Sequence, residues 1–166
     1  DDLLLYWQLL MAERDIAAGI GARFDHVLVD EYQDTNRLQA GILAALRPDG
    51  AGVTVVGDDA QAIYSFRAAT VENIREFPGG FDPQARVVTL EQNYRSTQSV
   101  LDAANALMAE AGSQYRKNLR SSHDSGPRPA YVVVQDDQAQ AGYVIEQVLA
   151  ARERGVDLRR QAVRHR

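Results

Sequence analysis

The chain of 166 residues contains no cysteine, which excludes a disulfide framework and a thiolate metal site. Its three histidines, His26, His123 and His165, are too scattered to predict a metal cluster. No run of about 18 apolar residues is present, and no basic segment precedes an apolar one, so we expect neither a membrane span nor a secretion signal. Together these absences predict a globular protein of the cytoplasm.

The chain also lacks an excess of positive charge. It has 18 basic and 23 acidic residues, and its net charge is −5. Residues 1–92 hold 15 of the acidic residues, whereas residues 93–166 hold 11 of the basic ones. This balance argues against binding nucleic acid by bulk attraction. It remains compatible with a protein whose nucleic acid lies in a narrow channel.

The most informative stretch of the sequence is VLVDEYQDTN, residues 27–36. Its apolar start predicts a short buried strand, and Asp30 and Glu31 follow at the carboxyl end of that strand, where open α/β sheets bind ligands. One carboxylate of such a pair can hold Mg²⁺, and the other can orient or deprotonate a water molecule. For an Asp-Glu pair alone, however, an exposed acidic turn is the more common explanation.

A second apolar run, residues 53–56, ends on Gly57 and on two further carboxylates, Asp58 and Asp59. Residues 35–46 lie between the two runs and carry apolar residues at helical spacing. A strand, a helix and a strand of these lengths form a right-handed crossover. We therefore expect both acidic ends to lie side by side at one edge of a parallel sheet.

Four side chains after the second run suggest ligand contacts: Gln61, Tyr64, Phe66 and Arg67. An amide near a terminal phosphate can sense whether that phosphate is present. Aromatic rings on a loop can stack on unpaired bases, at roughly 1–3 kcal/mol per base. Taken alone, packing of the two rings against their own loop is the favoured explanation.

A third apolar run, residues 87–90, leads to Tyr94 and Arg95, and Ser96 or Thr97 is predicted to cap the helix that follows. Tyr94 has the ring to stack on a purine, and Arg95 has the planar fork to bind a phosphate with two hydrogen bonds. A Tyr-Arg pair at the start of a helix is more often structural when it stands alone.

In this order the three segments resemble the UvrD/Rep/PcrA-like superfamily 1 DNA helicases, ATP-driven motors that move 3′ to 5′ along single-stranded DNA. VLVDEYQDTN resembles the family's Walker B segment, VVGDDAQAIYSFRAA its third motif and LEQNYRST its fourth. The resemblance covers about residues 1 to 163. It implies a parallel-sheet α/β fold of the RecA-like P-loop NTPase type, incomplete, with parts of two motor domains. It also implies ATP and Mg²⁺ as cofactors, single-stranded DNA as partner and a role in DNA repair.

The resemblance assigns nucleotide chemistry to five matching residues. Asp30, together with Glu31, would hold Mg²⁺, and Glu31 would also activate the attacking water. Gln61 would contact the γ-phosphate. Tyr94 would stack on the adenine, and Arg95 would act as an arginine finger from the second motor domain.

The resemblance assigns DNA contacts to Tyr64 and Phe66, which would lie along the single strand. Arg67 would connect this loop to the nucleotide, and Gln33 and Asp34 would support the Walker B segment. The chain departs from the family at Ala68, where glycine is usual. Because glycine adopts positive φ angles that alanine resists, the loop is expected to differ slightly there.

A Walker A loop, G-x-x-x-x-G-K-[ST], is missing, because the one lysine, Lys117, has no preceding glycines. We therefore expect the middle of a longer helicase, inactive alone, with residues 1–80 in the first motor domain and 86–166 in the second. The missing remainder would be its partner. Two alternatives remain: a non-catalytic piece that binds single-stranded DNA or a protein, and the motor of a helicase–nuclease subunit.

The remaining pattern predicts one helix over residues 3–18, further helices over 36–46, 97–110 and 138–153, and a helix capped by Thr70 that runs to Phe77. Further strands are predicted over 86–90 and 130–135. Residues 112–129 are rich in Ser, Gly and Pro and predict a long loop. Four basic residues lie in or near this loop: Arg116, Lys117, Arg120 and Arg128. A solvated loop is the favoured interpretation for them, and contact with phosphates is the alternative.

Overall fold

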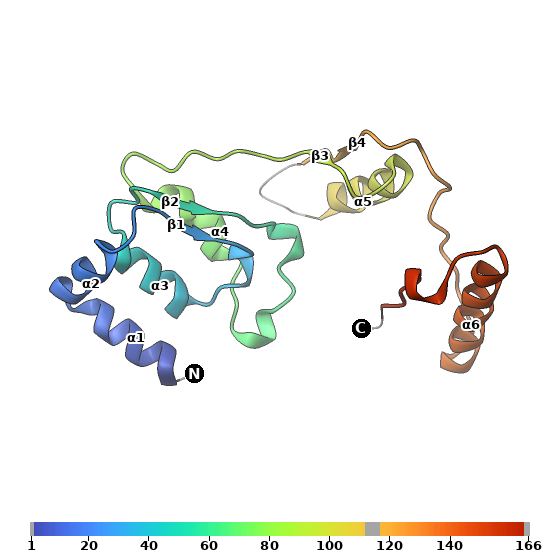
Figure 1. Ribbon diagram of the computed structural model, residues 1–166, viewed down its shortest axis with the longest axis horizontal. Helices are drawn as coiled ribbons and strands as arrows, with labels where there is room; N and C mark the ends of the chain where they lie inside the picture. Colours follow the sequence, from blue (N-terminus) through green and yellow to red (C-terminus); the bar gives the residue numbers. More distant parts are fainter. Residues whose placement is uncertain (1, 112–116, 165–166) are drawn as a thin grey trace. The chain divides into compact units, whose positions relative to one another are not determined.

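The computed structural model describes residues 2–111 and 117–164 and forms two compact units, one up to Pro127 and one from Arg128 onward (Figure 1). His165 and Arg116 lie outside the described residues. No helix in the described ranges is long and apolar enough to cross a membrane. The helices and strands are α1 (Asp2–Ala12), α2 (Arg14–Gly21), β1 (Val27–Val29), α3 (Arg37–Leu46), β2 (Val53–Val55), α4 (Glu72–Glu76), β3 (Gln92–Asn93), α5 (Gln98–Glu110), β4 (Arg120–Ser121) and α6 (Asp137–Glu153).

The first helical region differs from its prediction. The sequence predicts one helix over residues 3–18, but the backbone is extended at Glu13 (φ −78°, ψ 107°), which separates α1 from α2. Of the apolar side chains of α1, Met11 is buried, whereas Leu3, Trp7 and Leu10 are exposed. The reason is that α1 packs against α2 and α3, so it has partners in the described residues for only part of its surface.

The crossover predicted between the two acidic ends is present. β1 and β2 pair in parallel, with Val27 opposite Val53 and Val29 opposite Val55. α3 connects them and begins with a capping box, in which the side chain of Asn36 accepts a hydrogen bond from the Gln39 amide and the Gln39 side chain accepts one from the Asn36 amide. This parallel unit confirms the predicted α/β fold class.

Three aromatic rings join the crossover to the segment that follows α4. The ring of Tyr32 meets Phe77 edge-on, with centroids 5.3 Å apart, and Phe77 meets Phe81 in the same way at 5.1 Å. Burial raises the pKa of the Tyr32 hydroxyl above its ordinary value.

The predicted helix cap at Thr70 is wrong, since its hydroxyl hydrogen-bonds the Glu72 carboxylate and α4 starts without a side-chain cap.

The strands predicted over residues 86–90 and 130–135 are absent from the described structure. No backbone hydrogen bonds pair residues 86–90 with β2 within the described ranges, and Tyr131 is 93% exposed. The strands found instead are shorter: β3 pairs in parallel with β4, which lies inside the predicted loop 112–129. A β-branched run forms a strand only where a neighbour completes its hydrogen bonds.

Helices α5 and α6 agree with prediction in position. α5 follows Thr97, whose side chain makes no capping hydrogen bond, so the predicted cap is wrong although the boundary is right. In the second unit, the Asp136 carboxylate caps α6 by accepting a hydrogen bond from the Ala139 amide at 2.7 Å. The Gln161 side chain then donates to the carbonyl of Val148 and connects the following turn to the helix.

Candidate functional site

The carboxyl ends of β1 and β2 stay hydrogen-bonded beyond the strands themselves. The Val56 amide donates to the Val29 carbonyl at 2.8 Å, and the Tyr32 amide donates to the Val56 carbonyl at 2.9 Å. The chain therefore passes from both strands into a shared edge. The residues that follow β1 lie beside those that follow β2, as the crossover predicts.

Gln33 joins the two acidic segments. Its side chain is buried, with 2% exposure, and its Nε2 donates to Glu31 Oε2 at 2.6 Å. Its Oε1 accepts a hydrogen bond from the Asp58 amide at 3.0 Å. A β-carbon at Gly57 would lie 2.5 Å from the same Oε1, so this position requires glycine for close approach. The sequence indicates only that Gln33 supports its own segment.

Asp30 and Glu31 are exposed and lie in an unusual turn. Glu31 has a left-handed backbone (φ 49°, ψ 43°), and its amide donates to Asp30 Oδ1 at 2.9 Å. In the described ranges, no group of three acidic, histidine or cysteine side chains converges on one point. Two exposed carboxylates nevertheless fit Mg²⁺, which takes one or two protein carboxylates and completes its shell with phosphate and water oxygens.

Gln61 and Lys117 both bind the carboxylate of Asp58. Gln61 Nε2 donates to Oδ2 at 2.9 Å, and Lys117 Nζ lies 2.5 Å from Oδ1. Burial raises the pKa of Asp58, but the hydrogen bonds from Lys117 and Gln61 outweigh it and place that pKa below its ordinary value. The sequence predicts a solvated loop here, and its only hint of this ion pair is a single lysine in an acidic chain.

The aromatic loop after Gln61 is solvent-facing. The rings of Tyr64 and Phe66 lie 5.8 Å apart, and the guanidinium of Arg67 lies 5.4 Å and 5.6 Å from their centroids. Phe66 is 76% exposed. Ala68 has a φ of 61°, so the residue that replaces the usual glycine is held in the left-handed conformation that glycine favours.

Tyr94 and Arg95 lie in a tight turn between β3 and α5. The side chain of Asn93 accepts hydrogen bonds from the amides of Arg95 and Ser96, at 2.9 Å and 2.8 Å. The ring of His123 hydrogen-bonds the Tyr94 carbonyl at 2.8 Å, a contact that sequence reasoning missed. Both candidate side chains are exposed. No hydrogen bond or ion pair in the described ranges connects them to Glu31 or Gln61.

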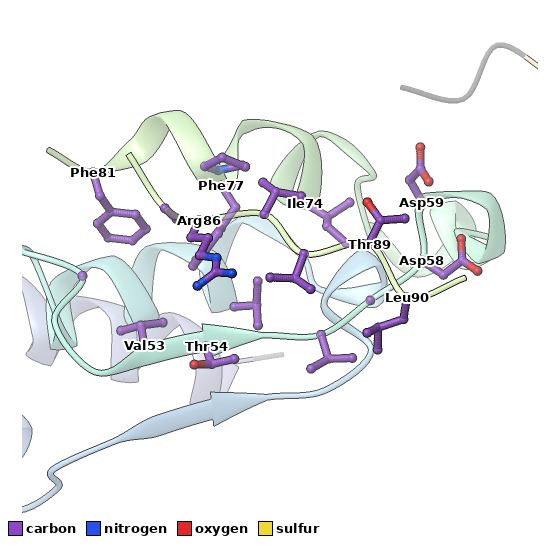
Figure 2. A pocket seen from close by; sticks show the side chains of 18 of the residues that line it. Val53, Thr54, Asp58, Asp59, Ile74, Phe77, Phe81, Arg86, Thr89 and Leu90 are labelled. Carbon is purple, nitrogen blue, oxygen red and sulfur yellow. The ribbon is translucent and has the colours of Figure 1, made fainter. Parts of the chain in front are cut away.

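A cavity of about 800 Å³ adjoins this edge. Figure 2 shows it between β2 and residues 85–90, with Phe81 at one end and Asp58 and Asp59 at the other. Most of the residues that line it are apolar, so the cavity is better suited to an apolar group than to a triphosphate. The cavity therefore borders the candidate site and does not contain it.

Comparison with known proteins divides the chain into two matched parts. Residues 1–82 match the UvrD/REP helicase N-terminal domain, and residues 88–166 match the UvrD-like helicase C-terminal domain.

Three relatives illustrate the likeness. The ATP-dependent DNA helicase PcrA of Leuconostoc citreum is 36% identical over 92% of this chain. UvrD1 of Mycobacterium bovis is 40% identical and DNA helicase II of Escherichia coli 38% identical, each over 87% of this chain. The chain spans 20% of the length of each of these three curated relatives. With both of its parts matched to this one group of proteins, the chain belongs to the UvrD-like helicase family.

Proposed function

We propose that the chain is the middle part of an ATP-dependent helicase that moves 3′ to 5′ on single-stranded DNA. Its relatives are named ATP-dependent DNA helicases, which supports ATP use and action on DNA. In this proposal residues 1–80 belong to a first motor domain and residues 86–166 to a second, and the remainder of the helicase is the partner of both. A cytoplasmic role in DNA repair is part of the proposal and rests on the family resemblance alone.

The observation that carries the proposal is the connection between the two acidic segments. Gln33 binds Glu31 on one side and the amide of Asp58 on the other, and Asp58 in turn binds Gln61. A group that orients the attacking water and a group that senses the terminal phosphate must keep a fixed separation, because positioning supplies most of the catalysis in phosphoryl transfer. This hydrogen-bonded chain provides such a fixed frame.

Each site residue then has a proposed task in nucleotide use. Asp30 and Glu31 would hold Mg²⁺, which when bound neutralises phosphate charge. Glu31 accepts the proton of the attacking water, and Gln61 donates to the γ-phosphate. Tyr94 stacks on adenine. Arg95, which belongs to the second motor domain, stabilises the negative charge of the phosphoryl group during its transfer.

The aromatic loop has the proposed task of following the DNA. Tyr64 and Phe66 stack on unpaired bases, since both rings lie on an exposed loop. Arg67 lies beside both rings, and its proposed task is to connect the loop to the nucleotide-binding residues. Movement of this loop would thereby report on whether nucleotide is bound.

The test is the substitution Glu31→Gln in the complete helicase that contains this segment. Glutamine keeps the size and the hydrogen bonding of Glu31 but removes the base, so DNA-stimulated ATP turnover should fall by roughly 10²–10⁴-fold. Binding of a fluorescent nucleotide should remain. Turnover within a factor of two of the unsubstituted enzyme would make the carboxylate structural, and absence of DNA-stimulated turnover in the unsubstituted enzyme would favour the non-catalytic alternative.

A further inference from the structure

Lys117 is the only lysine of the chain, and it lies far in sequence from the acidic edge that it contacts. It falls in the part matched to the C-terminal helicase domain, whereas its partners Asp58 and Asp59 fall in the part matched to the N-terminal domain. Its side chain is 21% exposed. One ammonium group therefore connects the two matched parts of the chain.

The carboxylate of Asp58 is held through both of its oxygens. Oδ1 accepts from Lys117 Nζ and from the Ala60 amide, the latter at 3.0 Å, and Oδ2 accepts from Gln61 Nε2 at 2.9 Å. If the carboxylate rotated to follow the partners of one oxygen, the hydrogen bond to the other oxygen would break. The position of the Gln61 amide consequently depends on what holds the opposite oxygen.

The neighbouring Asp59 explains why a cation is needed at this place. Its side chain is fully buried, and Lys117 Nζ lies 3.6 Å from its Oδ1. Two adjacent carboxylates repel each other, and a cation shared between them offsets that repulsion. Arg120, the nearby alternative, pairs with Glu91 at 3.3 Å instead. Of the basic residues near this loop that the structure describes, Lys117 is the one positioned to balance the pair.

We propose that Lys117 is a positioning residue that acts through Asp58 to hold the amide of Gln61 in place. This inference rests on the proposed role of Gln61 as the group that contacts the γ-phosphate. Lys117 connects residues 88–166 to ATP hydrolysis by a route separate from Arg95. Removal of its charge leaves Oδ1 of Asp58 held by the Ala60 amide alone, so the carboxylate turns more readily and fixes the Gln61 amide less firmly.

The test compares Lys117→Met, Lys117→Arg and the control Arg120→Met in the complete helicase. Lys117→Met should lower kcat for DNA-stimulated ATP hydrolysis by about 10- to 100-fold, the effect of a small displacement of a catalytic group, with KM for ATP unchanged. Lys117→Arg, which keeps the charge, should recover part of the rate. Arg120→Met removes a nearby cation that pairs elsewhere, and its kcat should match that of the unsubstituted enzyme.

A second background separates positioning from a purely structural role. In a Gln61→Ala enzyme, Lys117→Met should have no further effect on kcat, because both changes act through the same amide. An equal loss in both backgrounds, or an unchanged kcat in the first, would overturn the inference. Thermal melting of each variant identifies loss through unfolding, which would lower kcat regardless of Gln61.

A third measurement needs no activity and so distinguishes this inference from the proposed function. In the ¹⁵N-labelled 166-residue chain, Lys117→Met should shift the side-chain amide signals of Gln61, and Arg120→Met should not. Unmoved Gln61 signals would refute the connection through Asp58. Shifted signals in this chain, combined with a complete helicase that shows no ATPase activity, would leave the connection intact and remove only its proposed use in hydrolysis.

Discussion

Phe66 leaves most of its ring in water although it has two partners, Tyr64 and Arg67, close beside it. An exposed ring contributes little to folding, because its apolar surface has not been removed from solvent. The residue is thus available for contact with a ligand. Packing of the loop, the alternative that the bare sequence favours, has little support at this position.

The substitution Phe66→Ala should weaken binding of single-stranded DNA to the complete helicase by about 1–3 kcal/mol. Its melting temperature should hardly change, since a cost of roughly 3–5 kcal/mol applies to buried rings. Fluorescence anisotropy with a labelled oligonucleotide and thermal melting measure the two effects. Tyr131→Ala is a matched control, because it removes another exposed aromatic side chain. A large fall in melting temperature with DNA affinity intact would refute the stacking role.

Ala68 shows how much the identity of one residue can indicate about a loop. The family resemblance predicts an altered loop because glycine is usual at this position. The observed φ of 61° explains the family preference, since this conformation is easier for glycine. In this chain alanine adopts that left-handed conformation, so the residue change does not abolish the turn at this position.

At the scale of elements, the sequence predicts well wherever the signal is local. β1, β2 and α3 carry their own signals: β-branched runs, the capping residue Asn36 and apolar residues at helical spacing. Residues 86–90 carry an equally clear β-branched run and form no strand in the described structure. A strand depends on a pairing partner, and local sequence does not contain that partner.

The candidate site shows the same division. Asp30, Glu31 and Gln61 could be proposed from their places after two strands. The bonds that hold them could not, because Gln33 meets Asp58 across 25 positions and Lys117 meets it across 59. Such contacts depend on how the elements pack, which spacing along the chain does not reveal.

Gly57 offers a test of the frame between the two strand ends. Gly57→Ala would place a methyl group 2.5 Å from Gln33 Oε1 and force that side chain away from both of its partners. Loss of these buried hydrogen bonds should reduce the free energy of unfolding by about 1–3 kcal/mol, as measured by urea titration. Gly79→Ala is the control, because its new methyl group would meet no atom within 4 Å. Equal effects of the two substitutions would contradict the proposed frame.

At the scale of the whole molecule, the 166 residues contain the acidic segments but no Walker A loop. In phosphoryl transfer that loop and its lysine hold the β- and γ-phosphates, and Lys117 is engaged with Asp58 and Asp59 instead. The chain therefore contains candidate groups for water activation and phosphate sensing without a cradle for the nucleotide.

The purified 166-residue chain should accordingly show no DNA-stimulated ATP hydrolysis above background. A phosphate-release assay with and without single-stranded DNA measures this, and the Glu31→Gln chain serves as the blank. Turnover that depends on DNA and disappears in the Glu31→Gln chain would show the prediction to be wrong.

The pairing of Lys117 with two carboxylates has a practical consequence for labelling. Reagents that acylate primary amines can modify only one side chain in the sequence, because Lys117 is the one lysine and the guanidinium of arginine is not acylated by them. To react, that amine must leave Asp58 and Asp59, so acylation is slow while the ion pair is closed and faster once it opens. Once reaction at the terminal α-amine is subtracted, the rate at which an amine-reactive dye labels Lys117 measures how often the end of β2 separates from the segment that precedes β4.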